Sequence, residues 1–277
     1  MSLRSRDFGD RVDAAGAAGY AGLGLTANDY RDARAAGWTD HSMRDCLARR
    51  GLRVTEVESS WDWAGDPAED GREQALLAHL ARAFSIDEVS VVQFNRHEHA
   101  VLVERLARLC QAMAAARESQ PGPPVQVALE FMPYSELRTL ADAWRVVRDC
   151  PVSNLSLLAD NWHLQRSGGL DQLDAVPPGA ITSVQLDDVR AEPLADQTRE
   201  SRYHRELPGP GAVELLRRVR GRGSRPRLAV ELMSADWDRR PAREVAAATW
   251  AAAVHCLEQA RRAEADDKEA RPREEGN

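Results

Sequence analysis

The sequence predicts an α/β fold: a (β/α)8 TIM barrel whose first strand is short, degenerate or missing. Short apolar runs alternate with longer Ala-, Arg- and Leu-rich stretches, which is the order expected of parallel βαβ units. The chain has 277 residues, and 43% of them are hydrophobic, so it can form one barrel-sized core. Seven strand-like runs are clear, one fewer than a complete barrel contains.

The elements follow one another in a regular order. A helix over 7–18 precedes the first clear strand, around 22–25. Only Met1–Arg6 could supply an earlier strand, and MSLRSR is a poor strand sequence. In the next helical stretch, Thr39 is suited to be an N-cap and Gly51 a C-terminal stop. The pattern then predicts strands at 53–58, 88–94, 125–131, 154–160, 181–187 and 227–233, and helices at 72–84, 99–119, 135–148, 168–175, 212–221 and 241–263.

These elements form a single domain over residues 1–263, and the charged segment 264–277 is expected to be a disordered tail. The net charge of -7 disfavours nucleic-acid binding, which needs clustered positive charge. The four cysteines lack CxxC spacing, so free thiols in a reducing compartment are expected. No apolar run reaches the ~18 residues of a membrane span, and the N-terminus has no signal core. We therefore expect a cytoplasmic protein that does not bind membranes.

The last four strands all end on residues with hard oxygen donors. The runs VALE, SLLAD, TSVQ and LAVE place Glu130, Asp160, Gln185 and Glu231 at strand ends, and the active groups of a parallel barrel lie at that edge. Converging buried carboxylates would repel one another unless a cation compensates them. Oxygen donors favour Mn²⁺ or Mg²⁺, with Co²⁺ and Zn²⁺ as further candidates. The alternative is that each acid caps a neighbouring helix.

Four further residues are candidates for substrate contact. His163 follows Asp160 by three residues and can donate to a substrate oxygen or transfer a proton. Arg205 precedes the loop LPGPG, where its planar fork could hold an anionic or hydroxyl-rich substrate. Glu58 ends the strand at 53–58, and Trp61 follows in a Trp-rich loop, where it could form a wall against a sugar face or simply pack at the rim.

The chain resembles the xylose isomerase-like TIM-barrel superfamily, which includes sugar isomerases, epimerases, and inosose and dehydroshikimate dehydratases. The resemblance implies metal ligation by Glu130, Asp160, Gln185 and Glu231, and substrate contact or proton transfer by His163 and Arg205. Many members have His where this chain has Gln185, although amide-ligated relatives look similar to the dehydratase branch. The superfamily also has an abasic-site endonuclease branch, whose members resemble one another in a multi-zinc, histidine-rich site. This chain lacks those histidines, so it does not match that branch. The segments that carry the resemblance are ALEFMPYSELRTLADAW, LLADNWHLQRSGG, SVQLDDV, HRELPGPG and AVELMS.

The leading hypothesis is a divalent-metal-dependent isomerase or epimerase that acts through an enediolate on a small polyhydroxy-carbonyl substrate. Glu130 and Glu231 would remove and return protons. The alternative is a metal-dependent lyase that dehydrates an inosose- or 3-dehydroshikimate-like ring, because dehydration shares the same enolate. A third hypothesis is a non-catalytic barrel that binds a ligand or partner. The substrate is expected to be a small molecule, and a homo-oligomer is left open.

Overall fold

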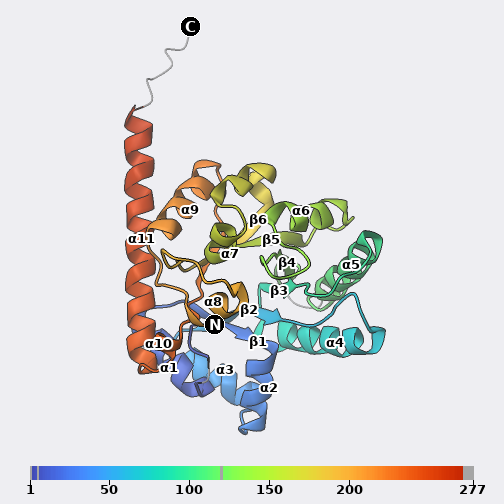
Figure 1. The fold of residues 1–277 in the computed structure, drawn as a ribbon. Helices are drawn as coiled ribbons and strands as arrows, with labels where there is room; N and C mark the ends of the chain where they lie inside the picture. The colour runs from blue at the N-terminus through green and yellow to red at the C-terminus, as the bar shows by residue number, and fades with distance from the viewer. Residues whose placement is uncertain (1, 5, 119–120, 271–277) are drawn as a thin grey trace.

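Parallel strands form the centre of the protein, and helices lie around them (Figure 1). The computed structural model describes residues 2–4, 6–118 and 121–270, without the side chains of 267–270. Seven strands pair in sequence order from the first to the last. This confirms the predicted α/β barrel with a degenerate or missing first strand. The strands are β1 (Gly22–Thr26), β2 (Arg53–Ser59), β3 (Glu88–Val92), β4 (Gln126–Glu130), β5 (Leu155–Asp160), β6 (Ile181–Leu186) and β7 (Arg227–Val230).

The helices connect successive strands and cover the outer face of the sheet. The structure adds three short helices that the sequence did not predict, α7 (Asn161–Arg166), α8 (Gln197–Tyr203) and α10 (Ala235–Asp238), and it divides the helical stretch expected after the first strand into α2 (Ala27–Ala35) and α3 (Asp40–Arg49). It also replaces the helix expected at 168–175 by a 3₁₀ turn, η1. The helices are α1 (Phe8–Ala18), α2 (Ala27–Ala35), α3 (Asp40–Arg49), α4 (Pro67–Phe84), α5 (His99–Ala115), α6 (Leu140–Asp149), α7 (Asn161–Arg166), η1 (Leu170–Ala175), η2 (Pro178–Ala180), α8 (Gln197–Tyr203), α9 (Pro210–Gly221), α10 (Ala235–Asp238) and α11 (Ala242–Ala270).

Local capping explains where several helices begin. Thr39 caps α3 as predicted, through a reciprocal box with Ser42. The helix expected to start at residue 135 starts only at Leu140, because Thr139 forms the same kind of box with Asp142. The residues before Thr139 instead form a loop that follows the end of β4. This loop lies at the edge of the sheet where the predicted donors are placed.

The barrel wall is open between β7 and β1, which do not pair with each other in the described part of the chain. Ser2 covers part of this seam: its hydroxyl donates to the carbonyl of Val230 at 2.9 Å and accepts from the amide of Leu232 at 2.8 Å. On the opposite side, Arg11 reaches the carbonyl of Gly24 at 3.4 Å. A cavity of about 410 Å³ remains between the two edges. At the seam, side chains therefore make hydrogen bonds with backbone groups that an eighth strand would otherwise pair with.

The C-terminal helix corrects the predicted start of the tail. α11 packs beside α9 and α1 (Figure 1) and continues to Ala270, so the segment from residue 264 begins as helix and not as a disordered tail. Glu264 forms an ion pair with Arg220 of α9, which ties this part of α11 to the barrel. Residues 271–277 lie outside the described residues.

The four cysteines are buried free thiols, as predicted. In the described part of the chain, none of the helices combines the length and the apolar character needed to cross a bilayer.

Candidate metal and active site

The predicted donors lie at the carboxyl end of the sheet, and all four are buried. Glu130 and Asp160 are the last residues of β4 and β5, Gln185 is the penultimate residue of β6, and Glu231 directly follows β7. Asp160 and Gln185 are register partners on neighbouring strands, so their side chains share one face. This placement is the one that a site inside the mouth of a barrel requires.

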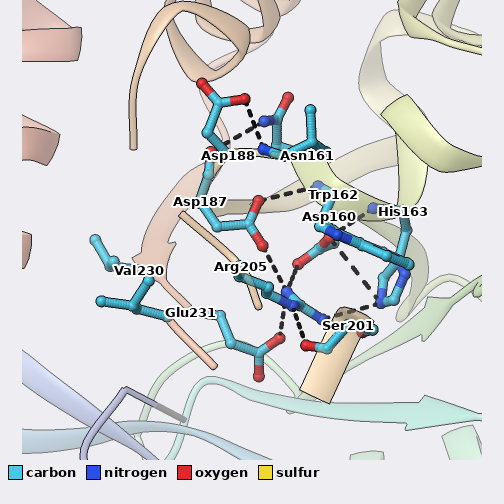
Figure 2. Close-up of polar contacts among 12 residues, drawn as sticks. Asp160, Asn161, Trp162, His163, Asp187, Asp188, Ser201, Arg205, Val230 and Glu231 are labelled. Carbon is cyan, nitrogen blue, oxygen red and sulfur yellow. Dashed lines mark hydrogen bonds and ion pairs between the residues drawn. The ribbon is translucent and has the colours of Figure 1, made fainter. Parts of the chain in front are cut away.

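Arg205 lies among three carboxylates, which we call the carboxylate cluster: Asp160, Asp187 and Glu231 (Figure 2). Its Nη1 atom is 2.7 Å from Asp160 Oδ2, 2.6 Å from Asp187 Oδ2 and 3.0 Å from Glu231 Oε2. Arg205 as a whole is only 1% exposed. The sequence suggested a substrate clamp at this position, whereas in the structure the side chain faces the acids.

The backbone around Arg205 explains why this side chain points inward. Its neighbours form two isolated antiparallel bridges, His204 with Ser234 and Glu206 with Asp188. These bridges hold the segment between the ends of β6 and β7. Ser201 of α8 then accepts from Arg205 twice, at its carbonyl from Nε (2.9 Å) and at its hydroxyl from Nη2 (3.0 Å). Polar partners thus surround the guanidinium and fix its plane.

The segment after β5 is a short helix and not a solvated loop. Asp160 caps α7, because its Oδ1 accepts from the amide of His163 at 2.8 Å. The cap turns His163 inward, where its side chain is fully buried and its Nε2 lies 3.3 Å from Glu130 Oε1. Ligand-type atoms of Glu130, Asp160 and His163 all lie within 4.8 Å of one another.

Burial perturbs the acids and the histidine in opposite directions. Burial raises the pKa of Glu130 well above its usual range, and the charges of Glu231 and Asp160 raise it further. The pKa of Asp187 is raised by burial and by Asp160, although Arg205 opposes the shift. Burial lowers the pKa of His163 to about 4, so this imidazole is neutral near pH 7. Burial thus opposes the ionisation of Glu130 and Asp187 even with the guanidinium of Arg205 nearby.

The donor set fits a divalent cation. Two buried oxygens, Glu130 Oε1 and Gln185 Oε1, make no hydrogen bond within the described part of the chain, although His163 Nε2 lies 3.3 Å from Glu130 Oε1. An orphaned buried acceptor is costly, and coordination to a metal would satisfy both oxygens. Asp160 and Glu231 would complete the set through oxygens that now face Arg205. Hard oxygen donors of this kind suit Mn²⁺ or Mg²⁺.

Above the acids, a cavity of about 430 Å³ opens to solvent. Glu58 and Trp61, the two other predicted substrate contacts, both line it. Trp61 is nearly buried, and its ring nitrogen donates to Asp70 at 3.2 Å, so packing also fixes this side chain. Burial raises the pKa of Glu58 well above its usual range, as do the charges of Glu231 and Glu130. Other lining residues are Phe94, Met132, Tyr134, Met233 and the arginines Arg4, Arg31 and Arg202.

The sequence reasoning missed Asp187 and Ser201. Asp187 lies two positions beyond Gln185, so strand alternation points both side chains to the same face. This alternation could have identified Asp187 as a residue of the site. Ser201 lies on α8, whose residues Gln197–Tyr203 show no apolar stripe, and no signal in the sequence marks it. Both residues act here as partners of Arg205.

Comparisons with known proteins agree with this architecture. The family described as xylose isomerase-like TIM barrel matches residues 12–254, and no curated protein matches. Among solved structures, a fusion protein of a xylose isomerase-like TIM barrel and a 4-hydroxyphenylpyruvate dioxygenase is similar, with a TM-score of 0.83 and 19% identity. The match covers 99% of this chain and 44% of that one, so this chain spans less than half of the fusion protein.

Two single-barrel structures are also similar. The IolI protein with a bound zinc atom has a TM-score of 0.79 and 15% identity, over 93% of this chain and 95% of that one. The probable 3-DHS dehydratase AsbF from Bacillus anthracis has a TM-score of 0.72 and 18% identity. The match covers 91% of this chain and 96% of that one. Identities this low support a common fold alone.

Proposed function

Because the chain belongs to the xylose isomerase-like TIM barrel family, we propose that it is a divalent-metal-dependent isomerase or epimerase acting on a small polyhydroxy-carbonyl substrate. The observation that carries this proposal is the pair of orphaned oxygens, Glu130 Oε1 and Gln185 Oε1, beside Asp160 and Glu231. Mn²⁺ or Mg²⁺ suits these donors best, and the similar IolI structure contains a bound zinc atom, which agrees with a divalent ion as the cofactor.

The residues of the site have distinct parts in this proposal. A divalent cation, when bound, would stabilise negative charge that develops on substrate oxygens. Glu130 is the first carboxylate for proton transfer, and burial raises its pKa well above the ordinary range. Glu231 is the second carboxylate for proton transfer. His163, neutral and 3.3 Å from Glu130, can orient that carboxyl and donate to a substrate oxygen.

The test is solvent-deuterium exchange into a panel of ketoses and cyclic ketones, with Mn²⁺ or Mg²⁺ added. We expect metal-dependent exchange at the carbon next to the carbonyl, since isomerisation and epimerisation both begin by removing that proton. Glu130→Gln should abolish exchange while the protein stays folded. If the metal-loaded protein exchanges with no member of the panel, the enzymatic proposal is lost and a non-catalytic ligand-binding barrel takes its place.

A second candidate is a metal-dependent lyase that dehydrates an inosose- or 3-dehydroshikimate-like ring. Arg202 favours an acidic, 3-dehydroshikimate-like substrate: this exposed arginine lines the mouth cavity and has no ion-pair partner among the described residues. It could hold a carboxylate at the end of the substrate remote from the acids. The similar fold of a probable 3-DHS dehydratase agrees with this candidate. Loss of water with a new conjugated absorbance would identify the lyase, whereas exchange without absorbance would identify the isomerase or epimerase.

A further inference from the structure

We propose that the guanidinium of Arg205 and a divalent cation are alternative occupants of the carboxylate cluster. In this view Arg205 is the counter-ion of the metal-free protein. It must leave Asp160 and Glu231 when metal binds, and Asp187 then remains as its partner. The inference rests on the proposed function, because it takes Asp160 and Glu231 as metal donors. It assigns Arg205 a competing role toward the metal, in addition to any contact with substrate.

The geometry of Nη1 carries the argument. This single atom lies 2.7 Å from Asp160 Oδ2 and 3.0 Å from Glu231 Oε2, which is close to the ~2.0–2.6 Å at which carboxylate oxygens coordinate hard cations. An ion that coordinated both of these oxygens would therefore need almost the position of Nη1. Two cations cannot share so small and so buried a space, since their repulsion in a low-dielectric site is large.

The pattern of satisfied and orphaned oxygens agrees with this exchange. Arg205 pairs with two of the four proposed donors, Asp160 and Glu231. It leaves the other two, Glu130 and Gln185, each with an oxygen that has no hydrogen-bond partner among the described residues. The guanidinium therefore contacts only two of the four proposed donors, and a cation that reached all four would satisfy this set more completely.

Asp187 explains where the displaced guanidinium would stay. It lies outside the proposed donor set, yet it makes the shortest of the three ion pairs, 2.6 Å to Nη1. Its other oxygen accepts from the backbone amide of Trp162 at 2.9 Å, so the carboxylate is held in place independently of Arg205. Ser201 offers two further acceptors, to Nε and Nη2 of Arg205. These contacts could retain the side chain near the site after Asp160 and Glu231 are lost.

The experiment measures Mn²⁺ affinity by calorimetry and the melting temperature with and without Mn²⁺. If the two cations compete, Arg205→Gln should bind Mn²⁺ at least about fivefold more tightly than wild type, the lower end of a typical coupling between two ligands. The metal-free variant should melt at a lower temperature than metal-free wild type, because Asp160 and Asp187 have lost their ion pair with the guanidinium. The increase in melting temperature on adding Mn²⁺ should be larger than in wild type.

Arg166→Gln is the matched control. Arg166 also pairs with a buried acid, Glu200, at 2.7 Å, but among the described residues it forms no ion pair with the carboxylate cluster. Its replacement should lower the melting temperature in both states by the same amount and leave Mn²⁺ affinity unchanged. If Arg205→Gln behaves in the same way as this control, the competition is refuted.

A second variant keeps the test decisive if Arg205→Gln folds poorly. Arg205→Ala leaves room for a free guanidinium ion, which can be added at concentrations far below those that unfold the wild type. Added guanidinium should raise the melting temperature of metal-free Arg205→Ala and weaken its Mn²⁺ affinity, with no such effect on wild type. An affinity that does not respond to guanidinium contradicts the proposal. If neither wild type nor any variant binds Mn²⁺, the proposed function itself fails; equal binding by all of them overturns only this inference.

Discussion

Asp160 acts on two neighbours at once, one through each oxygen. Oδ1 caps α7 at the amide of His163, and Oδ2 pairs with Arg205. Helix capping and a functional site were alternative explanations of an acid at a strand end, and in this residue capping and ion pairing coexist. The cap is what turns His163 toward Glu130. A single aspartate therefore orients the imidazole and also compensates the buried arginine.

Gln185 permits a test of the donor set at the level of one side chain. Gln185→Leu should weaken Mn²⁺ binding by at least about tenfold, since even the loss of an outer partner of a metal ligand typically costs ~10–100-fold. Gln185→His should retain binding but shift the preference toward Zn²⁺ or Co²⁺, because imidazole is a softer donor. Calorimetric titrations with each metal would measure both effects. An unchanged affinity in the leucine variant would remove Gln185 from the donor set.

His163 should affect the chemistry more than metal binding. His163→Ala is expected to reduce turnover by a factor of ~10²–10⁴, the usual contribution of a group that transfers a proton, with metal stoichiometry unchanged. The measurements are steady-state kinetics and metal analysis of the purified variant, with the exposed His255→Ala as control. Loss of metal from His163→Ala would instead make the imidazole a ligand, which its position beside Glu130 and Asp160 also permits.

At the scale of elements, the strands were easier to predict than the short helices. The seven strands are compact apolar runs, and their ends could be read directly, which also located the four predicted donors. α7 was missed because Asn161 starts the helix on the residue after β5 ends, so no turn residue separates them. α8 was missed because it lacks an apolar stripe. The pairing of Arg205 with Asp187 and Asp160 could not be predicted, since these acids lie 18 and 45 positions away in the sequence and only the fold brings them to the guanidinium.

The seam between β7 and β1 yields a prediction about stability. Ser2→Ala removes two hydrogen bonds at the exposed edge of β7, so the free energy of unfolding should fall by about 1–2 kcal/mol. Urea denaturation followed by circular dichroism would measure it. The same change at the exposed Ser60 serves as control and should have little effect. Equal stability of the Ser2 variant and wild type would mean that this residue does not help to close the barrel.

At the scale of the whole molecule, buried acids give the stability of the protein a pH dependence. Near the amino end of the sheet, Arg227 pairs with Glu56 at 3.0 Å and with Glu88, which also accepts from Ser183 at 2.7 Å. Burial raises the pKa of Glu88 to about 6, although Arg227 opposes the shift. The ordinary value is 4.5, so the folded state holds this proton more tightly than the unfolded state does.

The sign of the effect follows from that difference. The contribution of Glu88 to stability is fully present below pH 4.5 and is lost as the pH rises through about 6. The loss should be on the order of 2 kcal/mol. Glu88→Gln should remove this component, so the difference in unfolding free energy between wild type and variant should change across the window. Urea titrations at intervals from pH 4 to pH 7 would measure it; a constant difference would show that Glu88 keeps its ordinary pKa.

The open seam also has a consequence for how the chain folds. Each strand pairs only with its neighbours in sequence, so the sheet can grow from one βα unit to the next without waiting for its two ends to meet. A protein folds more slowly when long-range contacts must form before the transition state. Here the long-range contacts between the two ends of the chain, made by Ser2 and by α11 against α1, can form last. Loss of the Ser2 hydroxyl should accordingly accelerate unfolding and leave the refolding rate nearly unchanged.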